Sequence, residues 1–244
     1  MVQDFTKITS SGALAASGDE IAAENARFMA KVYLWMTVGL ALSGVTAFGV
    51  ATNETISNII LGNRLIFIGL ILAEFGVVIA FSSMLHKASA AMATGMYLFY
   101  AFLSGLTLSV IFFVYTYQSI IHVFGITSFA FAGLSLTGFI TKRDLGPVGS
   151  FCTMGLWGLV GFGLVSLFFP SMMTGAASKV YGIVGVIVFS GLTAYDTQKI
   201  KQLNIIGNEG TAEDHKEAVS GALTLYLDFI NLFLSLLRLM GKRR

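Results

Sequence analysis

Seven long apolar stretches constrain the fold more than any other feature of this sequence. Each holds about 20 residues with few charges, which is the length that a helix needs to cross the hydrocarbon core of a bilayer. Because backbone polar groups in lipid must be paired within their own segment, each stretch is expected to be an α-helix. The stretches cover residues 32–52, 65–85, 88–113, 120–140, 151–169, 179–198 and 222–240.

The composition supports a membrane protein. The chain has 244 residues, of which 55% are hydrophobic and 11% charged, and its mean hydropathy is +0.80. A soluble domain usually carries about 25% charged residues. We therefore predict an all-α membrane protein with seven transmembrane helices. Residues 31–244 form the transmembrane domain and residues 1–30 a polar N-terminal arm, with disorder expected over 1–18 and an amphipathic lead-in helix over 19–31.

Charge and residue usage exclude several classes of function. The formal net charge is only +2, so no basic face for nucleic acid is expected. A single cysteine, Cys152, excludes an internal disulfide. The three histidines, His86, His122 and His215, lie far apart and show no metal-ligand spacing. No cofactor is therefore expected, and the lipid bilayer is the first predicted partner.

The distribution of Lys and Arg predicts the orientation, because cytoplasmic loops are enriched in positive charge. If the N-terminus is cytoplasmic, nine Lys and Arg residues lie on the inner side and six on the outer side. The C-terminal tail disagrees, so the last stretch either crosses the membrane or re-enters it. Most connections are short, except a polar loop predicted over 199–220. The inner residues are Lys7, Arg27, Lys31, Lys87, Lys142, Arg143, Lys199, Lys201 and Lys216.

Three acidic residues interrupt the apolar stretches. Glu74 lies in the second stretch, Asp196 near the end of the sixth and Asp228 in the first half of the seventh. An aspartate at the centre of a membrane helix costs about 3 kcal/mol, so each acid needs a structural or functional reason. Asp196 is close enough to a helix end for its carboxylate to reach water, which is an alternative reason for that residue alone.

The seventh stretch has one polar face. At 100° per residue, Gly221, Thr224, Asn231 and Ser235 lie within about 60° of Asp228, and Arg238 within about 80°. A polar stripe on an apolar helix must face protein or water rather than lipid. The last helix is therefore predicted to be central in the bundle.

Asp196 and Asp228 are predicted to meet. The sixth stretch runs toward the side of the membrane from which the seventh departs, so the two carboxylates reach similar depth. Two ionised carboxylates about 4 Å apart repel by about 4 kcal/mol at an effective dielectric constant of 20. Such a pair would hold a shared proton. This is the chemistry of a pH sensor, of a cation site or of an aspartic protease.

The residues around both aspartates resemble the Bax inhibitor-1 family of transmembrane Bax inhibitor motif proteins. The resemblance rests on the block 191–198, GLTAYDTQ, and on the block 225–233, LYLDFINLF, followed by Leu236-Leu237-Arg238. Residues 105–109 and 141–145 are similar to other blocks of that family. The length and the N-terminal arm look like bacterial members, which implies a multi-pass protein of the bacterial inner membrane.

The resemblance implies a seven-helix fold with the last helix in the middle, and a pH-sensitive calcium leak. The di-aspartyl sensor of the family corresponds to Asp196 and Asp228, and the acid of its second helix to Glu74. Structurally studied bacterial members carry an arginine at the inner end of the second helix, latched to the aspartate of the sixth. Leu85 stands at that position here. His86 or Lys87 is expected to replace the latch.

Two functional hypotheses follow. The first is a proton-gated cation pathway without enzymatic activity, in which calcium is the ion and the oxygens of Asp196 and Asp228 are its ligands. Glu74, His86, Lys87, Asn231 and Arg238 are the expected supporting polar residues. The second is a regulatory partner of a membrane-anchored quality-control protease, bound through the N-terminal arm and residues 204–216.

Protease chemistry fits the sequence less well. Tyr195-Asp196 matches the first half of an intramembrane aspartyl protease motif, but Asp228 stands in Tyr-Leu-Asp-Phe rather than in Gly-x-Gly-Asp. A serine mechanism lacks a histidine well inside a predicted span to activate Ser104 or Ser190, because His122 lies at the very start of its stretch.

Overall fold

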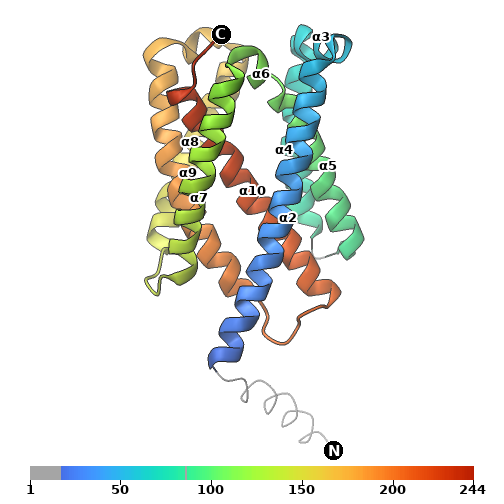
Figure 1. The fold of residues 1–244 in the computed structure, drawn as a ribbon, viewed down its shortest axis with the longest axis vertical. Helices are drawn as coiled ribbons and strands as arrows, with labels where there is room; N and C mark the ends of the chain where they lie inside the picture. The colour runs from blue at the N-terminus through green and yellow to red at the C-terminus, as the bar shows by residue number, and fades with distance from the viewer. Residues whose placement is uncertain (1–17, 86) are drawn as a thin grey trace, which may run out of the picture.

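The computed structural model describes residues 18–85 and 87–244, and it confirms the predicted all-α membrane fold. Seven helical spans in this part of the chain are long and apolar enough to cross a bilayer (Figure 1). The spans are α2 (Gly18–Thr52), α4 (Arg64–Met84), α5 (Ala90–Leu108) with α6 (Ile111–Val114), α7 (Tyr117–Ile140), α8 (Gly146–Phe168), α9 (Gly175–Leu203) and α10 (Ala212–Met240).

Several helices extend further than the apolar stretches predicted. The predicted polar loop over 199–220 is wrong for most of its length, because α9 continues to Leu203 and α10 begins at Ala212. The hydroxyl of Thr211 caps α10 by accepting from the backbone N–H of Asp214 at 3.2 Å. A helix can continue beyond the lipid because water pairs its polar side chains, so hydropathy alone does not mark where it ends.

The first span also begins earlier than expected. Residues 18–52 form one helix of 35 residues, so the lead-in segment and the first span are continuous. At 1.5 Å per residue it is about 52 Å long, well beyond a hydrocarbon core of about 30 Å. Gly18 is already helical, so disorder was wrongly expected there, and residues 1–17 lie outside the described part.

Two short elements were not predicted in the connections. The helix α3 (Glu54–Gly62) follows the first span, and its cap Asn53 accepts from the N–H of Ile56 at 3.1 Å. The 3₁₀ helix η1 (Pro170–Met173) follows α8. The third stretch is divided, since α5 ends at Leu108 and α6 starts at Ile111.

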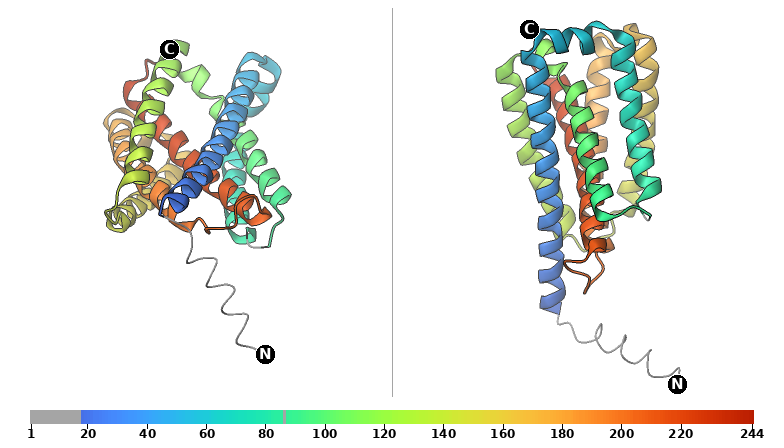
Figure 2. Two further views of the ribbon diagram at one scale, coloured as in Figure 1. Left: turned by 60° about the horizontal axis from the view of Figure 1, so that its bottom comes forward. Right: turned by 90° about the vertical axis from the view of Figure 1, so that its right-hand side faces the viewer.

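Contacts at the two ends show that successive spans run antiparallel. At one end, the ammonium of Lys201 donates to the carbonyl of Phe139, which joins the last turns of α9 and α7. At the other end, Arg64 of α4 donates to the carbonyl of Phe168 at 3.1 Å. There the N–H of Lys242 donates to Ser119 Oγ at 2.9 Å. The helix α10 therefore crosses the bundle rather than re-entering it, and the C-terminus lies at the end opposite the start of α2 (Figures 1 and 2).

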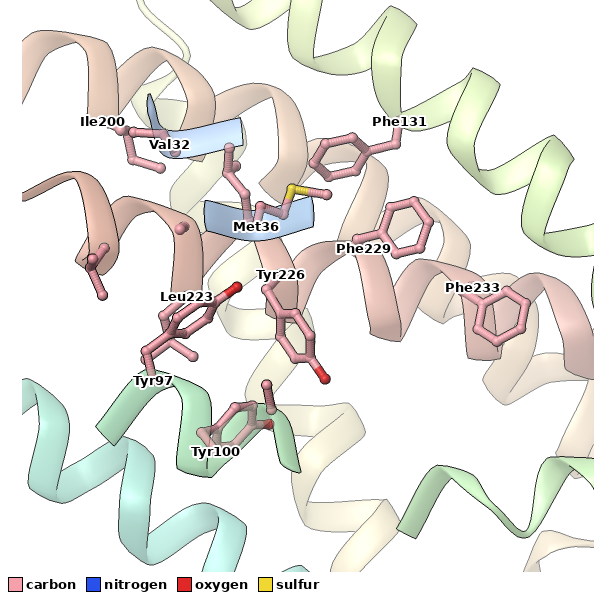
Figure 3. Packing of buried hydrophobic residues seen from close by; sticks show 14 of the residues in the cluster. Val32, Met36, Tyr97, Tyr100, Phe131, Ile200, Leu223, Tyr226, Phe229 and Phe233 are labelled. Carbon is pink, nitrogen blue, oxygen red and sulfur yellow. The ribbon is translucent and has the colours of Figure 1, made fainter. Parts of the chain in front are cut away.

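The last helix is the most buried of the seven spans. Half of its most apolar window is buried, against 6% for α4 and 11% for α8. It packs against α2, α5, α7 and α9. Figure 3 shows Tyr226 and Phe229 of α10 among side chains from several helices, and the Phe229 ring lies 5.4 Å from that of Phe131. This burial supports the prediction that the last helix is central in the bundle.

Ion pairs fasten the start of α2 to the link between α9 and α10. The ammonium of Lys31 lies 2.7 Å from the carboxylate of Asp214, which is 3% exposed and also accepts from the N–H of Gly210 at 2.8 Å. Arg27 pairs with Glu209 at 2.9 Å on the surface. The Arg27 guanidinium holds the pKa of the Glu209 carboxyl below its usual range. The buried pair is therefore the one expected to stabilise the fold.

We expect Lys31→Met to lower the free energy of unfolding by about 3 kcal/mol, because it leaves the buried Asp214 carboxylate without its cation. Thermal unfolding of the purified protein in detergent measures the effect. Arg27→Met is the matched control and should change the melting temperature little, because that pair is exposed. Equal losses in the two variants would contradict this assignment.

Candidate functional site

Close packing of α9 and α10 brings Asp196 and Asp228 together. Glycines on α9 allow the approach, since a side chain at Gly185 would clash with Ser235 of α10. A Cβ at Gly182 would lie 3.3 Å from the Ser235 carbonyl oxygen. Asp196 then lies close enough to Asp228 for the two carboxyl groups to interact. The structure therefore juxtaposes the two aspartates singled out in the sequence.

The Asp228 carboxyl is buried, and one of its two oxygens has no donor among the described residues. The residue is 4% exposed, and its Oδ2 atom has no hydrogen-bond partner within residues 18–85 and 87–244. Asp196 is only half-buried. A buried acceptor without a partner is costly, and an isolated buried carboxylate is more so. A proton held between the two carboxyl groups supplies the missing hydrogen bond and removes one negative charge.

Few other ionisable groups act on the pair. Lys199 lies one turn beyond Asp196 on the same helix, and its charge acts on Asp196. Its ammonium is 5.7 Å from the ring centre of Tyr195, and the residue is exposed. The buried thiol of Cys152, on α8, lies close enough to both aspartates for their charges to act on it. Among the described residues, a cation therefore acts on the half-buried Asp196, and none acts on the buried Asp228.

The expected replacement for the latch arginine stays a prediction. Leu85 follows the last turn of α4, and His86 lies outside the described residues. Lys87 is exposed and forms no ion pair within the part that the structure describes. Lys199 was not predicted as a partner of Asp196. Its spacing of three residues on one helix was the signal that could have indicated it.

Glu74 belongs to a separate polar cluster. Its carboxylate accepts from the hydroxyl of Thr107 at 2.6 Å and is half-buried. Its charge acts on Tyr226, whose hydroxyl lies 2.7 Å from Ser43 Oγ. Tyr226 and Asp228 are two residues apart on α10, so their side chains point about 200° apart. The Glu74 cluster and the aspartate pair therefore lie on different faces of α10.

Asn231 and Arg238 support the polar stripe without reaching the pair. The amide of Asn231 donates to the carbonyl of Leu227, one turn back, at 2.8 Å. The Arg238 guanidinium lies 4.8 Å from the ring centre of Tyr181 and 3.5 Å from Ser178 Oγ, both on α9. Ten residues of helix place Arg238 about 15 Å from Asp228. Much of the stripe therefore faces α9 rather than lipid.

The two aspartates alone supply only part of the ligand set of a bound calcium ion. Calcium takes six to eight oxygen ligands, and two carboxylates supply only part of that set. Over the residues that are described, no group of three or more His, Cys, Asp and Glu side chains could hold a metal ion.

Comparison with known proteins identifies the family. Residues 25–244 match the family described as "Inhibitor of apoptosis-promoting Bax1". The chain belongs to the Bax inhibitor-1 family. It is 46% identical to the inner membrane protein YbhL of Escherichia coli strain K12 over 218 residues, which cover 89% of this chain and 92% of YbhL. A protein of Borreliella burgdorferi is 44% identical over 89% and 93% of the two chains.

Family membership and the fold agree. With seven spans and these bacterial relatives, the chain is a multi-pass membrane protein of the Bax inhibitor-1 family. A protein of Deinococcus radiodurans is 39% identical over 88% of this chain and 90% of its own length. The motif blocks around Asp196 and Asp228 therefore indicated the correct family.

We expect Asp228→Asn to remove a pH-dependent destabilisation of the wild-type protein. Below the pH at which the shared proton leaves, the two proteins should be similarly stable. Above it, the wild type has two facing carboxylates, whose repulsion is up to about 4 kcal/mol, while the variant has one. Melting temperatures measured against pH test this difference. Asp19→Asn, at an exposed acid of α2, is the control, and a parallel decline of wild type and Asp228→Asn at high pH would contradict it.

Proposed function

We propose that the protein is a pH-sensitive cation leak of the membrane, with calcium as the permeant ion and the Asp196–Asp228 pair as its gate. The observation that carries this proposal is the contact between two acids from adjacent membrane-spanning helices, one with a buried and unpartnered oxygen. Such an arrangement changes its charge with pH at a position where lipid offers no compensation. The proposed function is transport rather than enzymatic catalysis.

The gate responds to the loss of a proton. At low pH the carboxyl groups are neutral or share a proton, so α9 and α10 stay packed. As pH rises, the shared proton leaves and the two carboxylates repel by about 4 kcal/mol. That energy is enough to shift a two-state balance between closed and open forms by roughly 10³. The leak therefore increases with pH.

Calcium and protons compete at the same oxygens. A divalent cation between two carboxylates offsets their repulsion, as a proton does, but it requires both groups to be ionised. Calcium consequently favours loss of the shared proton. In this proposal the half-buried Asp196 is the member of the pair that the ion meets first.

We place the protein in the inner membrane of a bacterium with its N-terminus in the cytoplasm. The location is supported by the E. coli relative, which is named an inner membrane protein. The orientation is supported by the excess of Lys and Arg at the end of the bundle that holds the start of α2 and the links 141–145 and 204–211. The opposite end holds α3 and the C-terminal tail.

Labelling of single cysteines tests the orientation. In a Cys152→Ala background, a membrane-impermeant maleimide applied to intact spheroplasts should label Glu54→Cys but not Asp144→Cys. Both positions are exposed and lie at opposite ends of the bundle. Lysis should make the second position reactive. Labelling of Asp144→Cys alone in intact spheroplasts would reverse the orientation.

Calcium flux into proteoliposomes tests the function itself. Purified wild-type protein should leak more calcium as pH rises, whereas Asp196→Asn and Asp228→Asn should each lose the pH dependence because one carboxyl has no neighbour to repel. Asp19→Asn should behave like the wild type. A wild-type profile in both pair variants would place the sensor elsewhere, with Glu74 as the next residue to test. Absence of flux at every pH would overturn the leak and leave regulation of a membrane-anchored protease as the alternative.

A further inference from the structure

A recess between α2 and α7 is not used by the proposed gate. It has a volume of about 990 Å³, and the ring of Phe229 from α10 lies in its lining between the two helices. The rings of Phe124 and Phe131 each lie 5.4 Å from that of Phe229. Most of the remaining lining is aliphatic, with Leu40 and Leu136 among it. The recess is therefore an apolar site built from three helices.

The recess lies along the membrane-spanning part of the bundle. Its lining residues extend from Ala26 to Val45 on α2 and from Phe124 to Phe139 on α7, which are about 28 Å and 22 Å of helix. One leaflet of the hydrocarbon core is about half of 30 Å thick. Val45 is 72% exposed and Leu136 57% exposed, so the rim faces the surrounding bilayer. Lipid chains are the medium that meets this opening.

The positively charged side chain of Lys201 lies at one end of the recess. The ammonium of Lys201 lies 5.0 Å from the ring centre of Phe139 and 2.6 Å from its carbonyl oxygen. Phe139 lines the recess close to the end of α7. An ammonium has three donors, and this carbonyl takes one. Lys201 is half-exposed in the last turn of α9, where helices leave the hydrocarbon and lipid phosphates begin.

We propose that the recess binds an acyl chain of an anionic phospholipid, whose phosphate is held by Lys201. The volume is at the upper end of the range of 300–1,000 Å³ typical of small-ligand sites. A helix from a second protein, about 10 Å wide and 22 Å long, would need about 1,700 Å³. An acyl chain fits the elongated shape and the apolar lining, and the phosphate complements the charge at the inner end.

Bound lipid would touch a polar chain that leads toward the gate. The hydroxyl of Tyr33 lies 2.6 Å from Ser135 Oγ, and Ser135 Oγ lies 2.9 Å from Thr197 Oγ1. Tyr33 and Ser135 both line the recess, and Thr197 follows Asp196 in α9. The acyl chain therefore packs against hydrogen bonds that join α2, α7 and the helix that carries Asp196.

Native mass spectrometry of the purified protein with dioleoyl phosphatidylglycerol or dioleoyl phosphatidylcholine tests the site. The wild type should retain one phosphatidylglycerol about ten-fold more tightly than phosphatidylcholine, as expected for one charged hydrogen bond. Ala132→Trp, at an exposed position in the lining, should weaken retention of both lipids. Lys201→Gln should abolish the preference and keep the binding of phosphatidylcholine.

Ala73→Trp is the matched control, because Ala73 is exposed on α4 and does not line the recess. Equal lipid retention by the wild type and Ala132→Trp would overturn the proposal. An unchanged preference in Lys201→Gln would remove Lys201 from it. Loss of a protein dimer in Ala132→Trp with unchanged lipid retention would instead make the recess an interface between two copies. None of these outcomes depends on calcium flux, so this site and the proposed leak are tested separately.

Discussion

The contact between Asp196 and Asp228 imposes the strongest condition on the rest of the structure. Two carboxyl groups facing each other inside a bundle must lose a charge, gain a cation or move apart. Each of these outcomes depends on how tightly α9 and α10 are held. The glycines of α9 allow close packing. Ion pairs join α2 to Glu209 of the 204–211 link and to Asp214 in the first turn of α10. The pair thus lies between packed segments, and in the proposed gate a change of its charge moves them.

Two polar clusters lie on different faces of α10. On one face, Asp228 lies close to Asp196, and the proposed gate depends on a proton that the two would share. On another face, Tyr226 packs edge-on against Tyr97 and Tyr100 and bonds to Ser43. Those hydroxyl contacts carry no net charge, so they join α10 to α2 and α5 at any pH near neutrality. Movement driven by the aspartates is therefore expected in α9 relative to α10, while α2, α5 and α10 stay together.

The sequence predicted the number of membrane spans because hydropathy and length suffice for that purpose. It also placed Asp196 and Asp228 together, since alternating spans bring the end of one helix beside the start of the next. Hydropathy could not predict that α9 and α10 extend past the lipid, because water stabilises polar residues in a helix as well as in a loop. The pairing of Lys31 with Asp214 was also beyond prediction, because residues 183 positions apart meet only through the packing of α2 on α10.

Two further features, the action of Lys199 on Asp196 and the recess between α2 and α7, were not predicted. Helical spacing was sufficient to predict Lys199 as a partner of Asp196. Because Leu85 stands at the position of the latch arginine, its neighbours His86 and Lys87 were predicted instead. The recess between α2 and α7 has no signature in the sequence, because its lining residues look like ordinary lipid-facing positions. These residues enclose a volume only because α2 and α7 are separated above the ring of Phe229.

The shared proton is measured most directly by infrared spectroscopy of protein labelled with ¹³C at the aspartate side-chain carboxyl. The label separates the band of a protonated aspartate from that of Glu74. A protonated aspartate band should persist toward neutral pH, disappear as pH rises, and be absent from the Asp196→Asn, Asp228→Asn double variant. Addition of calcium at fixed pH should decrease the band in the wild type. A band that remains in the double variant, or one that does not respond to calcium, would contradict a gate in which protons and calcium compete for Asp196 and Asp228.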